Sequence, residues 1–150
     1  MEKPIISSKT LNNMQPGVLT AGGFLGDDKR KPERIIEEDL NALNSLGVDK
    51  NELVKRMREA FEKSASGFGE WIEINEKIEA LRDDSRGKIS CPFEDGAFGK
   101  TNVQVRKKDR SMQVVFSELS IHLIDNHNFF QGHGAAYRND PAALAGIFGL

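Results

Sequence analysis

Three histidines lie within twelve residues near the C-terminal end of the chain, and one cysteine, Cys91, lies upstream of them. Imidazole and thiolate are both preferred ligands of zinc, and imidazole is largely neutral near physiological pH. The candidate ligands of a four-coordinate site are Cys91, His122, His127 and His133. An aspartate such as Asp95 or Asp125 is an alternative ligand. The predicted cofactor is zinc or another divalent transition metal.

The spacing His122-x4-His127 follows a predicted β-hairpin and resembles the second half of a zinc finger with two cysteines and two histidines. In that module the hairpin supplies the cysteines, but here it offers only Cys91, so the chain is not assigned to the family. Residues five apart are separated by roughly 140° around an ideal helix. We therefore expect the two histidines not to share a face unless the helix ends between them, and Asn126 and Asn128 favour such an end.

A second interpretation keeps the histidines and drops the metal. His133 lies between Gly132 and Gly134, and Tyr137 and Arg138 follow within a few residues. Histidine can act as a general acid or base, and arginine can hold a carboxylate or phosphate through two hydrogen bonds. This pattern predicts that a small anionic ligand binds here. The structural alternative is a glycine-dependent turn in which Arg138 pairs with a neighbouring carboxylate.

Other motifs give weaker signals. Cys91 precedes a proline and is not part of a Cys-x-x-Cys pair, so we expect a buried, unreactive thiol. The glycines between Gly22 and Gly26 lack the spacing of a nucleotide-binding loop. The basic segment 106–110 has no interleaved aromatic residues, and the formal net charge is -2, so the sequence gives no strong nucleic-acid signal.

Helical periodicity is clear in the first half of the chain. Pro32 and the repeat of Ile36, Leu40 and Leu43 predict a helix over 33–46 that ends at Gly47. A second helix begins at an Asp49 cap, and the pair predicts a helical hairpin over 32–69. Residues 1–31 are rich in glycine, proline and small polar residues and predict an extended arm, with one short strand near Val18.

The second half of the chain predicts strands and then helices. We expect a β-meander over 77–117, in which 77–82 forms a hairpin with 88–93, and a turn at 94–96. A helix capped by Ser117, a histidine-rich loop and a short helix from Asp140 complete 117–150. Segregated helices and antiparallel strands predict one α+β domain over 1–150.

The sequence predicts a binding role for this chain, with its functional surface between His122 and Arg138. The alternative is a metal-dependent hydrolase that activates water on a histidine-bound ion. Protein partners are also considered, including a second copy of the chain that docks on an aromatic surface at Phe129 and Phe130. No apolar stretch in the sequence is long enough to predict a membrane span. The single cysteine and the lack of a visible secretory signal predict a cytoplasmic location.

Overall fold

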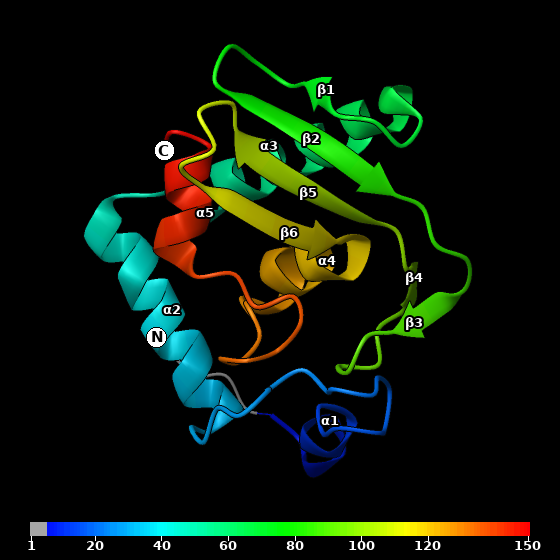
Figure 1. The fold of residues 1–150 in the computed structure, drawn as a ribbon. Coiled ribbons are helices and arrows are strands. Elements are labelled where there is room, and N and C mark those ends of the chain that lie inside the picture. Colours follow the sequence, from blue (N-terminus) through cyan, green and yellow to red (C-terminus); the bar gives the residue numbers. More distant parts are fainter. Residues whose placement is uncertain (1–5) are drawn as a thin grey trace.

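The computed structural model describes residues 6–150 and confirms the α+β class (Figure 1). The helices are α1 (Ser8–Asn13), α2 (Pro32–Leu46), α3 (Lys50–Lys63), the 3-10 turn η1 (Ser64–Gly67), α4 (Glu118–His127) and α5 (Pro141–Ile147). The strands are β1 (Ile72–Glu73), β2 (Ile78–Asp83), β3 (Lys88–Ser90), β4 (Ala97–Gly99), β5 (Asn102–Lys107) and β6 (Gln113–Ser117).

The helical hairpin has the ends that the sequence predicts. Pro32 occupies the first turn of α2, and Gly47 closes that helix in the left-handed conformation with φ 69°. The Asp49 carboxylate then accepts a hydrogen bond from the Asn51 backbone N–H and caps α3. These signals are local, so they can be recognised without knowledge of the tertiary structure.

The main sheet is antiparallel, with the strand order β1-β2-β5-β6. The predicted hairpin of 77–82 with 88–93 is wrong, because β2 pairs with β5 and β3 pairs with β4 in a separate two-stranded sheet. The pairing places Ala80 opposite Val105, and both side chains are fully buried. β2 and β5 share an alternating apolar face that helices cover, whereas β3 offers only Ile89 to such a face.

Residues 6–31 do not form an extended arm, and they contain no strand near Val18. The first five residues of the predicted arm lie outside the described residues. Residues 8–13 form α1, and Val18 lies in a turn with 45% of its surface exposed. Met14, Phe24 and Leu25 are buried against the rest of the domain. Isolated apolar residues without periodicity gave no sign of this packing, which depends on distant parts of the chain.

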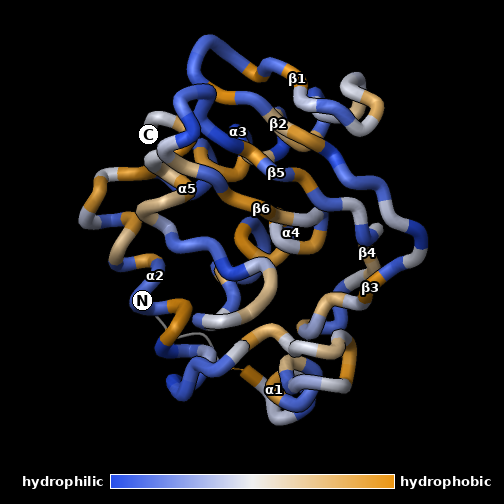
Figure 2. Tube along the Cα trace, in the orientation of Figure 1, coloured by the Kyte–Doolittle hydropathy of each residue, from blue (hydrophilic) through white to orange (hydrophobic). Residues whose placement is uncertain are grey.

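Two hydrophobic clusters meet at the segment after α4. The first packs α3, α4 and α5 against one face of the main sheet, and the second joins the N-terminal segment, α2, α4 and the β3–β4 hairpin. Figure 2 shows the hydrophobic positions along β5, β6 and α4 at the centre of the molecule. Phe129 and Phe130 point into different clusters and are both buried, so the predicted aromatic docking surface is wrong. Within residues 6–150, none of the helices has the length and apolar character of a membrane span.

Candidate metal site

The turn between β3 and β4 supplies two side chains of the site, Cys91 and Asp95. The Cys91 backbone N–H donates to the Gly96 carbonyl at 2.9 Å, and the Glu94 N–H donates to the Cys91 carbonyl at 2.9 Å. Glu94 and Gly96 both have positive φ angles, 64° and 150°, which bend the chain tightly. The predicted turn at 94–96 is therefore present, and it brings Cys91 and Asp95 to the same side.

Helix α4 supplies His122 and His127. Ser117 caps its start through a reciprocal pair of hydrogen bonds with Ser120, and Asn128 ends it with φ 55°. The helix does not end between the two histidines as Asn126 suggested, because it continues through His127. The two ring centroids are nevertheless 5.3 Å apart. Both side chains reach the same carboxylate, which lies between them. The two residues can therefore share a site although they lie on different faces of the helix.

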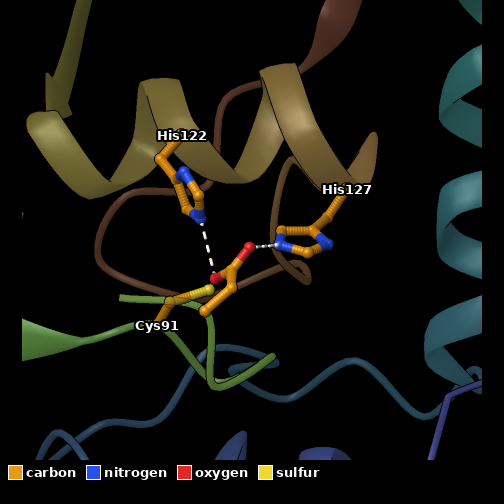
Figure 3. Close-up of side chains that lie close together, drawn as sticks. Cys91, His122 and His127 are labelled. Carbon is orange, nitrogen blue, oxygen red and sulfur yellow. Dashed lines mark hydrogen bonds and ion pairs between the residues drawn. The ribbon is translucent and has the colours of Figure 1, made fainter. Parts of the chain in front are cut away.

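Four potential ligand atoms converge between the turn and the helix, as Figure 3 shows. The Asp95 carboxylate contacts both rings, with Oδ1 2.9 Å from Nε2 of His122 and Oδ2 2.7 Å from Nε2 of His127. The ligand atoms of these three residues and the sulfur of Cys91 all lie within 4.8 Å of one another. The turn and the helix therefore present one sulfur, one oxygen and two nitrogen donors to a common centre.

Aromatic side chains fix the two imidazole rings. Phe93 stacks on His127 at a centroid distance of 3.9 Å and an interplanar angle of 5°. Phe98 lies against His122 at 4.3 Å. The histidine side chains are only 13% and 19% exposed. This shell limits the rotation of the rings and excludes much of the solvent around their nitrogens.

Asn126 determines which nitrogen of His122 carries the proton. Its amide nitrogen lies 3.0 Å from Nδ1 of His122 and 3.4 Å from the His122 carbonyl oxygen, which can only accept. The amide therefore donates, Nδ1 accepts, and Nε2–H donates to Asp95. A metal at Nε2 would place the ring proton on Nδ1, and Asn126 would then turn its carbonyl oxygen toward that proton.

The carboxylate and the thiol have opposite pKa shifts. Burial raises the pKa of the Cys91 thiol to about 12, and the neighbouring Asp95 carboxylate adds to this effect. For Asp95, burial alone would raise the pKa, but hydrogen bonds from Cys91, His122 and His127 outweigh it and hold the pKa well below its usual range. At neutral pH the site without metal therefore contains an ionised carboxylate and a protonated thiol.

Helix α1 supports the ligand-bearing turn from outside. The buried side-chain amide of Asn13 donates to the Pro92 carbonyl at 3.0 Å, and Lys9 forms a 3.1 Å ion pair with Glu94. On the opposite side, the Gly99 N–H donates to the Glu118 carboxylate at 3.2 Å. The N-terminal segment, which the sequence did not connect with the site, thus helps to position it.

The remaining sequence candidates lie elsewhere. His133 is exposed, and its backbone N–H donates to Asp28 at 3.1 Å. Asp125 pairs with Arg58 at 2.7 Å. The structure therefore brings Asp95 into the ligand group in place of His133. A sequence signal for Asp95 was present, since Cys91-x3-Asp95 has the spacing of a zinc-finger ligand pair.

Arg138 and Tyr137 have different environments. Arg138 donates to both carboxylate oxygens of Asp39, at 2.5 and 3.0 Å, and to the Gln131 carbonyl at 2.9 Å. These contacts correspond to the structural alternative, in which arginine pairs with a carboxylate of the protein. Tyr137 lines a separate cavity that is bordered by the N-terminal segment.

Comparisons with protein-family models, with curated proteins and with solved structures gave no significant match. The function proposed below therefore rests on the side chains of the site.

Proposed function

We propose that this chain is a zinc-binding domain in which one ion joins the β3–β4 turn to α4. The proposed ligands are Cys91, Asp95, His122 and His127. The main support for this proposal is that the four donor atoms lie within 4.8 Å of one another. Thiolate, imidazole and carboxylate are the three protein ligand types that zinc accepts in tetrahedral sites.

The spacing of the donors supports this proposal. Zinc–ligand bonds of roughly 2.0–2.3 Å in a tetrahedron separate the ligand atoms by about 3.3–3.6 Å. The two Asp95–histidine contacts, at 2.9 and 2.7 Å, are shorter than this. A small outward movement of the carboxylate would therefore make room for the ion.

The topology of the site also supports zinc. As in a zinc finger, a hairpin turn supplies the first ligand pair and the following helix supplies the second. Asp95 takes the position of the second cysteine. The segment between the pairs is longer than in a finger, because β5 and β6 are inserted before the helix. The ion would thus hold a small hairpin against a helix of a larger domain.

We propose that this metal has a structural role in a binding domain and is not catalytic. Four protein donors complete a tetrahedral coordination, whereas catalytic zinc keeps one position for water. A hydrolase would require one of the four side chains to stay unbound, and no observation favours this. We further propose a cytoplasmic location, because a reducing compartment keeps the Cys91 thiol available as a ligand.

Thermal unfolding with and without zinc tests the structural role. Free zinc at about a thousand times its Kd would stabilise the folded state by about 4 kcal/mol. For a chain of this size, each kcal/mol raises Tm by about 2–4 °C, so the expected increase is about 8–16 °C. The measurement is circular dichroism of chelator-treated protein with and without added zinc.

Two variants provide the controls for this experiment. His122→Ala combined with His127→Ala removes two ligands and should abolish the zinc-dependent increase in Tm. His133→Ala removes the exposed histidine and should retain the full increase. An increase that persists in the double variant, or a wild-type protein that zinc does not stabilise, would contradict the proposed role.

A further inference from the structure

A cavity of about 330 Å³ lies away from the four proposed metal ligands. It is bordered by the N-terminal segment, the β3–β4 hairpin and the loop after α4. Buried side chains form its floor, and these are Phe24, Ser117, Leu119 and Gln131. Tyr137 borders the same space. A volume of this size is at the lower end of the range for small-molecule sites.

Gln131 is the unusual residue of this floor. It is only 4% exposed, and among residues 6–150 its side-chain amide has no hydrogen-bond partner. Its amide atoms are absent from the fully enclosed unpaired atoms of the described chain, so they remain accessible from the cavity. The donor and the acceptor of this amide therefore face the cavity without a partner from the described part of the chain. A group that enters the cavity would satisfy them.

Backbone hydrogen bonds hold the chain at Gln131 in an uncommon conformation. Its φ angle is 69°, an uncommon conformation for a residue with a side chain. The Gln131 carbonyl accepts from Arg138, and the next N–H, of Gly132, donates to the Phe24 carbonyl at 2.9 Å. Strained residues that surrounding contacts hold in place occur preferentially at ligand sites.

We propose that this cavity binds a small aromatic ring that carries an adjacent hydrogen-bond donor and acceptor, as in an aromatic amide or a nucleobase. A glutamine amide pairs with such an edge through two hydrogen bonds. Phe24 and Leu119 are apolar residues of the lining against which the ring can pack. The rim carries both Lys100 and Asp83, whose opposite charges do not select an anion. Among the buried residues of the lining, Gln131 is the one with a primary amide, so we assign to it the recognition of the ligand's hydrogen-bonding edge.

A nuclear magnetic resonance titration with three matched probes tests this proposal. Benzamide offers a donor and an acceptor, N,N-dimethylbenzamide lacks the donor, and benzoate carries a charge and no donor. We expect benzamide to shift the backbone amide signals of Gly22, Gly23 and Gly99, which line the cavity. We expect the other two probes to bind at least tenfold more weakly, because a site built to hydrogen-bond discriminates against ligands that lack the partner.

Two variants test whether Gln131 causes the preference for benzamide. Gln131→Leu should abolish the tenfold preference for benzamide over N,N-dimethylbenzamide. Gln104→Leu replaces a half-buried glutamine that pairs with Gln113 outside the cavity and should leave the preference unchanged. The proposal is overturned if none of the probes shifts the three glycine signals at 10 mM, or if benzoate or the dimethyl amide binds as tightly as benzamide to the wild-type protein. The probes are compared on the unmodified chain, so this result does not depend on the folding of a variant.

Discussion

Replacement of Arg138 by methionine should destabilise the fold strongly. The guanidinium donates to both oxygens of Asp39, at 2.5 and 3.0 Å, and the two side chains are only 9% and 7% exposed. The pair joins α2 to the loop after α4. Removal of one partner leaves the Asp39 carboxylate buried without its counter-charge, which typically costs about 3–5 kcal/mol. At about 2–4 °C per kcal/mol, Tm should fall by about 6–20 °C.

A double variant separates the lost attraction from the cost of the remaining charge. Arg138→Met combined with Asp39→Leu removes both charges, and buried pairs replaced by apolar residues are often nearly neutral. The Gln131 carbonyl still loses its donor, at a cost of about 1–3 kcal/mol. The double variant should therefore be more stable than the Arg138→Met variant, although it should stay below the wild type.

Urea unfolding followed by circular dichroism measures these free energies of unfolding. Arg34→Met is the matched control, because Arg34 forms an exposed ion pair with Glu38 that should contribute less than about 1 kcal/mol. A loss in Arg138→Met no larger than that of the control would show that Asp39 does not depend on Arg138 for its counter-charge. So would a double variant that is no more stable than the single one. Either result would restore Arg138 as a candidate for the anion site considered from the sequence.

Three further predictions concern the site and its supports. Zinc binding must remove the proton of the Cys91 thiol, whose pKa is raised to about 12, so the Kd for zinc should fall about tenfold for each pH unit between about pH 7 and 9. Competition with a chromophoric chelator measures this slope, and Cys91→Ser should flatten it; an equal slope in both proteins would contradict the thiolate ligand. Asn126→Ala removes the partner of His122 and should weaken zinc binding by about 10- to 100-fold in the same assay, whereas an unchanged Kd would remove its supporting role. Gly132→Ala would place a Cβ 2.3 Å from the Leu25 carbonyl oxygen and should lower stability by about 1–3 kcal/mol, and a Tm equal to that of the wild type would show that the loop yields without cost.

Local signals predicted α2, α3, α4 and α5 correctly, because their causes lie within a few residues, whereas α1 was not predicted. Gly47 and Asp49 mark the end of α2 and the start of α3, and the Asp140 cap and Pro141 mark the start of α5. Strand pairing was not predictable in the same way. The choice of β5 over β3 as the neighbour of β2 depends on which apolar faces the helices can cover, and that is a property of the assembled domain.

The site was predictable in part. Cys91, His122 and His127 stood out by residue type, and the structure brings all three together. Asp95 remained an alternative, because aspartates are common in turns and spacing alone does not select one. His133 is close to the other histidines in sequence and was therefore a candidate ligand, but α4 ends at His127 and the following loop carries His133 to the surface.

Metal content tests the central proposal most directly. Elemental analysis and native mass spectrometry should be performed on protein purified without a metal-binding affinity tag. We expect one zinc ion per chain in the wild type and in His133→Ala, and none in the variant that combines His122→Ala with His127→Ala. A folded wild-type protein that contains no metal and takes up none when zinc is added would contradict the proposal, as would a double variant that retains the full zinc content.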